Sequence, residues 1–493
     1  MQNLKAKKGI VSAGHTQTAE AAIEILNVGG NAYDAAIAAL LASYVTEPCM
    51  SSAGGGGFMI VHTADKKNLL FDFFCQTPKH KKPLSQIDFY PVELNFGDAK
   101  ETFHIGAGSV ATPGSIAGIF DIYEKMCTLP MKVLVEPAIK YAKEGVTVDA
   151  FQHYDFLLLQ NIIKGDKQMN PSFFPSNNGL IKEGETLAFP EMADYLDYLT
   201  KEGPRAFYEG EIARKIVDTL SEKGGFINLE DLKEYKATIR QPYSFNYKGY
   251  QLITNPYPSV GGGMIDYALK NIEQVELPEI FSEKHLDLLY RAIGKAQKEW
   301  AEVLKNHQAQ ANKRGCTTHF SILDEDGNAA GVSSTNGEGS ACSIPGTQIM
   351  LNNMLGEAAL FPNGFHSWPC NTRVSSLMSP TIALNKSGRA VIVTGSGGAG
   401  RIPAVIMQCI HYMLDYEMAS HDAIKSPRVY LENGKLDVEP GFSLSNNHKI
   451  PDCEIARFSE QDMYFGGVHT VTYYRGKLGG AGDKRRSGVL LKN

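Results

Sequence analysis

Two threonines, Thr317 and Thr335, lie at the two ends of one candidate β-hairpin and could together form a nucleophilic site. The arms are residues 317–323 and 329–335, and a polar turn containing Asp326-Gly327 joins them, as is typical of a hairpin. A threonine becomes a nucleophile when the backbone is cut just before it, because its freed α-amino group acts as the base for its own hydroxyl. The ends of a hairpin lie side by side, so Thr335 is placed to hydrogen-bond Thr317. By composition alone, a hairpin without catalytic function is the simpler interpretation.

A run of glycines at residues 395–400 is the second feature with possible chemistry. It follows a candidate strand at 391–394, precedes a candidate helix at 402–416, and matches the pattern Gly-x-Gly-x-x-Gly. A dinucleotide site would require an apolar strand soon after this helix, but residues 415–422 are polar. The sequence favours an oxyanion hole, because N–H groups at a helix N-terminus suit the negative oxygen of a tetrahedral intermediate.

Other segments predict the elements that position these residues. Residues 16–42 predict two helices interrupted near Gly29-Gly30-Asn31, and residues 58–61 and 69–74 predict neighbouring strands. The polar segment 79–103 is predicted to be mostly loop. Further helices are expected at 115–145, 191–201, 209–223, 229–235, 264–274 and 285–304. Residues 309–314 are polar, which suits an exposed linker that reaches a cleavage point.

Composition excludes several classes of protein. The 493 residues carry a net charge of −6, so a nucleic-acid partner is not expected. The eight cysteines form no Cys-x-x-Cys pair, which argues against a zinc ribbon and fits a reducing compartment. The longest apolar stretch, 35–45, is too short to span a membrane. No signal peptide is apparent, so we expect a cytoplasmic protein, with export open if a leader was removed.

The motif Thr317-Thr318-His319-Phe320, followed by Asp326-Gly327-Asn328 and Leu351-Asn352-Asn353, resembles the start of the small subunit of γ-glutamyltranspeptidases. These are N-terminal-nucleophile hydrolases that cut themselves in two. The resemblance extends nearly end to end, and each further motif is weak alone but lies in the family's order. These motifs are residues 29–36, 47–48, 54–58, 112–114, 136–137, 258–262, 378–381 and 394–396.

The resemblance implies a fold and a maturation event. We expect an α+β protein, a four-layer αββα sandwich made as one precursor and cut between Cys316 and Thr317. The segments 1–316 and 317–493 would stay together as one folded unit, a heterodimer of cleavage fragments that could oligomerise further. Thr317 would attack an amide carbonyl, Thr335 would orient it and Asn336 would contact the substrate. The amides of Gly398 and Ala399 would form the oxyanion hole, without a metal or organic cofactor.

The chain departs from the family at the positions that bind the glutamyl group. Phe74 stands where the family has an arginine that binds the substrate α-carboxylate, and a phenyl ring cannot replace a guanidinium there. Ser375 and Ser376 keep a serine pair shifted by one position, so that Leu377 takes the place of the second family serine. Glu357 stands where the family usually has an aspartate that binds the substrate amine. Arg373 and Arg401 are candidates to supply the missing positive charge.

Three functions remain open from the sequence. The first is a γ-glutamyl hydrolase or transferase that acts on glutathione or related amides. The second is an amidase or acylase of the same fold that acts on another acyl group, which the phenylalanine at 74 favours. The third is a binding protein that never matures, against which Thr317 and Thr335 argue. The aromatic residues Phe361, Phe365 and Trp368 could line a pocket or only pack their own loop.

Overall fold

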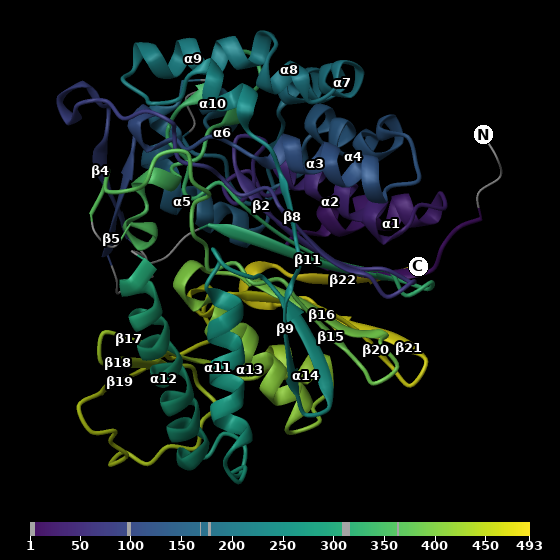
Figure 1. The fold of residues 1–493 in the computed structure, drawn as a ribbon, viewed down its shortest axis with the longest axis vertical. Helices are drawn as coiled ribbons and strands as arrows, with labels where there is room; N and C mark the ends of the chain where they lie inside the picture. Colours follow the sequence, from purple (N-terminus) through teal and green to yellow (C-terminus); the bar gives the residue numbers. More distant parts are fainter. Residues whose placement is uncertain (1–4, 96–99, 168, 176–178, 308–315, 362–363) are drawn as a thin grey trace.

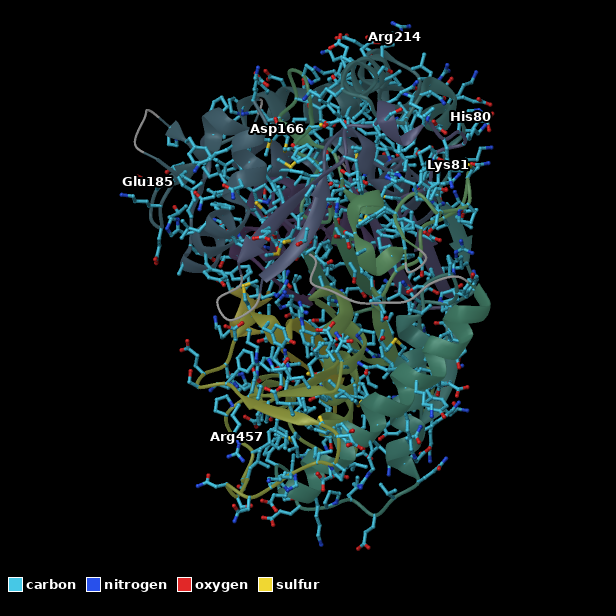
Figure 2. The ribbon with its side chains drawn as sticks, turned by 90° about the vertical axis from the view of Figure 1, so that its left-hand side faces the viewer. His80, Lys81, Asp166, Glu185, Arg214 and Arg457 are labelled. Atoms are coloured by element: carbon cyan, nitrogen blue, oxygen red, sulfur yellow. The ribbon has the colours of Figure 1, made fainter. Side chains whose placement is uncertain are left out.

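The computed structural model describes residues 5–95, 100–167, 169–175, 179–307, 316–361 and 364–493. Two antiparallel β-sheets lie face to face, and helices cover the outer face of each (Figure 1). This is the four-layer αββα sandwich expected from the sequence. Exposed charged side chains project from both halves, as Arg214 and Arg457 do (Figure 2). No helix in the described part of the chain is long and apolar enough to cross a membrane.

The first sheet contains seven of the described strands, in the order β22-β1-β11-β12-β2-β3-β8, and every neighbouring pair is antiparallel. In that order the strands are Val489–Lys492, Gly9–Ala13, Thr317–Asp324, Ala329–Thr335, Gly56–His62, Asn68–Asp72 and Thr238–Arg240. Strand β1 lies between β22 and β11, so it separates two strands from the C-terminal part of the chain. The Asn493 side chain accepts from the Gly9 N–H at 2.8 Å and donates to the Lys7 carbonyl at 2.9 Å.

The second sheet contains six of the described strands, in the order β21-β20-β16-β15-β10-β9. They are Lys477–Ala481, Gly467–Tyr474, Ala390–Gly397, Thr381–Leu384, Tyr250–Thr254 and Tyr243–Tyr247. Strands β11 and β12 of the first sheet pack on β16 of the second. Smaller sheets are formed by β4 (Tyr90–Asn95) with β5 (Lys100–Ile105), β6 (Val146–Thr147) with β7 (Thr186–Leu187), β13 (Ser343–Ile344) with β14 (Ile349–Met350), and β17 (Val429–Glu432) with β18 (Lys435–Val438) and β19 (Glu454–Arg457).

Helices form the two outer layers. Helices α1 and α2 contact the first sheet directly, whereas α11 and α13 contact the second (Figure 1). On the side of the first sheet are α1 (Thr16–Asn27), α2 (Ala32–Thr46), α3 (Ser115–Met126), α4 (Met131–Glu144), α5 (Ala150–Gly165), α6 (Asn170–Phe173), α7 (Pro190–Glu202), α8 (Arg205–Tyr208), α9 (Glu211–Glu222) and α10 (Leu229–Glu234). On the other side are α11 (Gly261–Glu273), α12 (Glu283–His307), α13 (Ile402–Leu414) and α14 (Ser420–Lys425).

Side-chain alternation along the strands divides the hydrophobic core into two layers. On β2, Met59 and Val61 pack with the helices of the first layer, whereas Phe58 and Ile60 pack toward the second sheet. Helix α2 is buried along its whole length, as its alanine-rich sequence predicts. Its N-terminus is capped reciprocally by Asn31 and Asp34.

Most of the predicted elements near the site are confirmed. The hairpin of β11 and β12 has the expected ends, and Thr317 is paired directly with Thr335. The glycine run before β2 brings two backbones close together, since a Cβ at Gly55 would lie 2.3 Å from the Thr335 carbonyl oxygen. Strand β16 and helix α13 flank the second glycine run, and no dinucleotide-binding sheet follows them among the described residues.

Some local predictions were wrong. The polar segment 79–103, expected to be mostly loop, contains β4 and the first residues of β5, because alternating polar side chains suit a strand exposed on one face. Helix α5 was not predicted, although Asp149 and Gln152 form a capping box at its start. Helix α11 begins at Gly261, inside the glycine triplet expected to precede it. The linker prediction for 309–314 falls outside the described residues.

Candidate active site

The start of strand β11 carries Thr317, and the end of β12 carries its neighbour Thr335. The Thr335 hydroxyl donates a hydrogen bond to the Cys316 carbonyl oxygen at 2.6 Å and accepts one from the Gly337 N–H at 3.0 Å. The carbonyl that receives this bond belongs to the peptide bond just before Thr317. Both threonines are 5% exposed, so this contact is shielded from bulk water.

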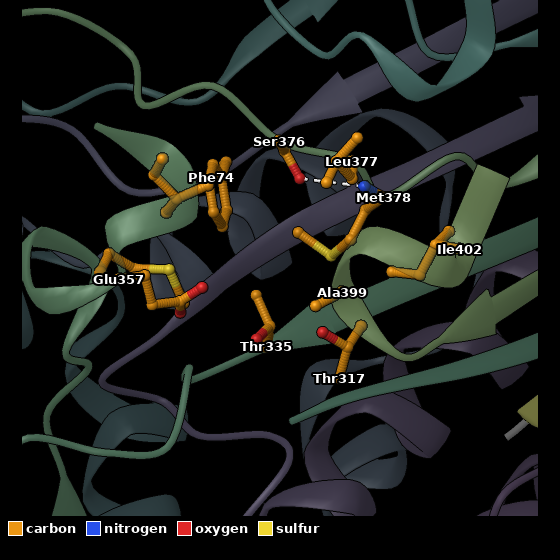
Figure 3. Close-up of a pocket in the computed structure, with 11 residues that line it drawn as sticks. Phe74, Thr317, Thr335, Glu357, Ser376, Leu377, Met378, Ala399 and Ile402 are labelled. Atoms are coloured by element: carbon orange, nitrogen blue, oxygen red, sulfur yellow. Dashed lines mark hydrogen bonds between the residues drawn. The ribbon is translucent and has the colours of Figure 1, made fainter. Parts of the chain in front are cut away.

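A small pocket lies over the two threonines (Figure 3). Its volume is about 40 Å³. Thr317 and Thr335 belong to strands of the first sheet, and the other lining residues lie in loops, in short 3-10 turns and at the start of helix α13. The full set of lining residues is Phe74, Thr317, Thr335, Met354, Glu357, Leu360, Ser376, Leu377, Met378, Ala399 and Ile402. Apart from the two threonines, Ser376 and Glu357, these side chains are apolar.

The glycine run at the end of β16 touches the candidate nucleophile. A Cβ at Gly397 would lie 1.9 Å from the Thr317 carbonyl oxygen, so only glycine allows this approach. Gly398 and Ala399 both have positive φ, 115° and 44°, and Ala399 begins the turn that leads into helix α13. A left-handed alanine costs on the order of 1 kcal/mol, and such strain is typical of functional loops. The first N–H groups of a helical segment have no intrahelical acceptor, which suits the predicted oxyanion hole.

Glu357 is the titratable side chain among the residues that line this pocket. Burial raises its pKa to about 8, so the carboxyl is mostly protonated at neutral pH. Ser376 lies on another wall, where its hydroxyl accepts a hydrogen bond from the Met378 N–H at 3.1 Å (Figure 3). The pocket thus pairs one acid with mainly apolar walls.

The Phe74 ring forms part of one wall of the pocket. It is 2% exposed and stacks on Phe58 with the ring centroids 5.5 Å apart. Arg373 lies near its backbone and donates to the Phe74 carbonyl oxygen. The same guanidinium donates to the Tyr235 hydroxyl at 2.6 Å and lies 3.4 Å from the buried Asp72 carboxylate.

A second group of buried polar side chains flanks the start of the hairpin, and sequence reasoning did not identify it as part of the site. Thr318 donates to Glu47 at 2.5 Å, and the Cys316 thiol lies 3.9 Å from the Asp155 carboxylate. Burial raises the pKa of Glu47 and that of Asp155 each to about 7. In the sequence, Asp155 could be noticed only as an acidic residue among the buried positions of helix α5.

The structure brings six of the predicted site residues around one pocket: Phe74, Thr317, Thr335, Glu357, Ser376 and Ala399. Gly398 precedes Ala399 in the same loop. The other three are not among the lining residues. Asn336 donates to the Met350 carbonyl at 3.3 Å, Ser375 donates to the Pro258 carbonyl at 2.9 Å, and Arg373 holds the contacts described above. Their roles toward a substrate stay predictions.

Neither Arg401 nor the loop aromatics line the pocket. The Arg401 guanidinium is buried and lies 4.6 Å from the centre of the Tyr464 ring. Trp368 is 1% exposed and packs edge-on against Phe226 at 5.4 Å. Phe365 packs against Phe89 at 5.0 Å, so these aromatic side chains pack their loop against the rest of the protein. No cluster of three or more potential metal ligands occurs among the described residues.

Two stacked antiparallel sheets between helices, with a threonine at the start of a central strand, define the fold of the N-terminal-nucleophile hydrolases. Within that class, the family model "Gamma-glutamyltranspeptidase" matches residues 18–284 and 264–492. The chain belongs to the gamma-glutamyltranspeptidase family.

Individual relatives agree with this assignment. The chain is 29% identical to a glutathione hydrolase proenzyme of Escherichia coli K12, with 98% of this chain and 91% of that protein covered. It is also 29% identical to the acylase ACY 1 proenzyme of Pseudomonas sp. SE83, with 90% and 87% covered. The crystal structure of a cephalosporin acylase from Bacillus halodurans has the same fold, with a TM-score of 0.84, 24% identity, and coverage of 99% and 96%.

Proposed function

We propose that this protein is an N-terminal threonine hydrolase or acyltransferase that first cuts its own chain between Cys316 and Thr317. The observation that carries the proposal is the hydrogen bond of 2.6 Å from the Thr335 hydroxyl to the Cys316 carbonyl oxygen. A donor at this oxygen stabilises the negative charge that develops there when a nucleophile attacks the carbonyl carbon. The names of the relatives as proenzymes support the same conclusion.

Self-cleavage would proceed by an acyl shift. The Thr317 hydroxyl oxygen attacks the Cys316 carbonyl carbon, the peptide bond breaks, and the Thr317 nitrogen takes up a proton as an ester forms. Water then hydrolyses that ester, which leaves a carboxylate on Cys316 and a free amine and hydroxyl on Thr317. Because strands of both fragments alternate in the first sheet, the fragments would remain one heterodimer.

The mature site would then act on an external amide. The freed amine of Thr317 accepts the proton of its own hydroxyl, whose oxygen attacks the substrate carbonyl. The amides of Gly398 and Ala399 stabilise the oxyanion, the amine product leaves with a proton, and the acyl group stays on Thr317. Water releases this group in hydrolysis, and an amine releases it in transfer.

Two acyl classes are candidates for the substrate. A γ-glutamyl amide such as glutathione is supported by the family and by relatives named glutathione hydrolases. A different acyl group is favoured by the Phe74 ring and the Leu377 side chain in the pocket wall, and by relatives named acylases. The two classes share the chemistry at Thr317 and differ only in how the acyl chain is bound.

An intact mass of the purified protein under denaturing conditions tests self-cleavage. We expect two fragments that together account for the chain of 53.9 kDa plus one water, with the smaller fragment beginning at Thr317. The variant Thr317→Ala should remain a single chain, and Thr317→Ser should still be cut because it keeps a hydroxyl. A wild-type chain that stays whole, or a cut Thr317→Ala variant, refutes the proposal.

A further inference from the structure

The charged groups that line the small pocket over Thr317 and Thr335, here called the acyl pocket, are unbalanced. Its eleven lining residues include one acid, Glu357, and no lysine, arginine or histidine. A carboxylate inside a largely apolar pocket requires a cation or strong hydrogen-bond donors, because its desolvation is otherwise costly. The lining side chains offer it no cation, only hydroxyl groups and the single proton of an un-ionised Glu357, and an ionised Glu357 would repel it. The pocket therefore disfavours an acyl group that carries its own carboxylate.

The two arginines that the sequence suggested, Arg373 and Arg401, do not supply the missing charge. The Arg373 guanidinium bonds to a backbone carbonyl, to the Tyr235 hydroxyl and to the Lys236 carbonyl, the last at 2.8 Å, and it also pairs with Asp72. Turning it toward the pocket would break these contacts. Arg401 is buried against the Tyr464 ring.

Size limits the acyl chain as well. A volume of about 40 Å³ accommodates on the order of three water molecules, and hence a chain of only a few non-hydrogen atoms beyond the carbonyl. Phe74 cannot retract easily, because its ring is stacked on Phe58. Figure 3 shows the Glu357 carboxyl across the pocket from Thr317, where it would meet the far end of such a chain.

We propose that the acyl pocket binds a short acyl group that carries an amino group and no carboxylate, with Glu357 as the specificity residue that binds the ammonium. The inference rests on the proposed function, because it assumes attack by Thr317. Apolar walls would contact the methylene groups, and an ammonium at the end of the chain would form a charge-assisted hydrogen bond to Glu357. Because the pocket is otherwise apolar, this pair would decide which acyl groups are accepted.

Four anilide substrates test the proposal, since they differ only in the two charged groups. The γ-glutamyl anilide carries both the amine and the carboxylate, the 4-aminobutyryl anilide only the amine, the glutaryl anilide only the carboxylate, and the butyryl anilide neither. With the cut wild-type enzyme, we expect kcat/KM for the 4-aminobutyryl anilide to exceed that for each carboxylate-bearing anilide at least tenfold. It should also exceed that for the butyryl anilide.

Variants identify the residues responsible. Glu357→Gln should reduce the preference for 4-aminobutyryl over butyryl at least tenfold while turnover of butyryl persists, a change that a general loss of structure would not produce. Glu276→Gln, at an exposed site, is the matched control and should leave the preference unchanged. Phe74→Arg should shift preference toward γ-glutamyl. If that variant does not fold, Leu377→Ser tests the same wall with a smaller side chain.

The outcomes distinguish a failure of the inference about the acyl group from a failure of the proposed function. Faster turnover of the γ-glutamyl or glutaryl anilide than of the 4-aminobutyryl anilide overturns the inference and leaves the proposed function intact. An unchanged amine preference in Glu357→Gln removes Glu357 from the specificity role. A cut enzyme that releases aniline from none of the four also overturns the inference. A chain that is never cut refutes the proposed function, and the inference with it.

Discussion

Replacing Thr335 with valine should slow self-cleavage strongly while the fold is retained. Valine has nearly the shape of threonine but no hydroxyl, so the variant loses the 2.6 Å hydrogen bond to the Cys316 carbonyl oxygen. In the resting chain, such a bond contributes on the order of 1 kcal/mol. When Thr317 attacks, the same oxygen becomes an anion, and removing one donor to an oxyanion costs about 2.7–4 kcal/mol, or a factor of 10² to 10³ in rate.

The assay follows the fraction of cut chain with time after synthesis in a cell-free translation, by gel and by intact mass. Thr335→Ser is the matched control, because it keeps both the donor to Cys316 and the acceptor for the Gly337 N–H. The valine variant leaves that N–H unpaired, at a cost of about 1–3 kcal/mol in stability, so its folding is checked by circular dichroism. A folded valine variant that is cut as fast as wild type would show that this donor does not stabilise the oxyanion.

Three further predictions concern stability, each measured by urea unfolding of the uncut Thr317→Ala protein. Burial raises the pKa of Glu47 to about 7, so the folded state keeps a proton that the unfolded chain releases at lower pH. Glu47 should therefore contribute a loss of stability on the order of 3 kcal/mol as pH rises from about 5 to 7. Glu47→Gln should remove this contribution, whereas that of Asp155, whose pKa is raised in the same way, should remain. Gly263→Ala should destabilise by about 1–3 kcal/mol, since its Cβ would lie 1.8 Å from the Trp300 ring, whereas Gly294→Ala should be neutral or stabilising. Asp72→Asn should cost about 3 kcal/mol or more, because it leaves a buried arginine contact without its counter-charge.

Local patterns in the sequence predicted the elements that carry the nucleophile. The hairpin of β11 and β12 has two apolar arms and a glycine turn, and its ends agree with the structure to within a residue. Strand β16 and helix α13 were predicted for the same reason, since both are strongly apolar and bounded by glycines or polar turns. The hairpin of β4 and β5 escaped prediction, because its many polar residues indicate a loop by composition, although their alternation with apolar residues is typical of a strand exposed on one face.

Contacts between distant segments could not be predicted from spacing. Resemblance to the family pointed to Phe74 and Glu357, which lie far apart in the chain and meet in the pocket only after both sheets form. The role of Arg373 was less accessible, because its partners Asp72 and Tyr235 come from other parts of the chain. No sequence pattern indicates which of two directions an arginine side chain takes when acids and carbonyls lie on one side and a pocket on the other.

The bonds from Asn493 to Lys7 and Gly9 place the two ends of the described chain beside each other, at the edge strand β22 and its neighbour β1. A short linker could therefore join these ends, and the gene could be opened at the cleavage point instead. Such a circular permutant would begin at Thr317, once its initiator methionine is removed, and would end at Cys316. It would carry the free α-amino group from the moment of synthesis, so catalysis could be studied apart from maturation in a single covalent chain.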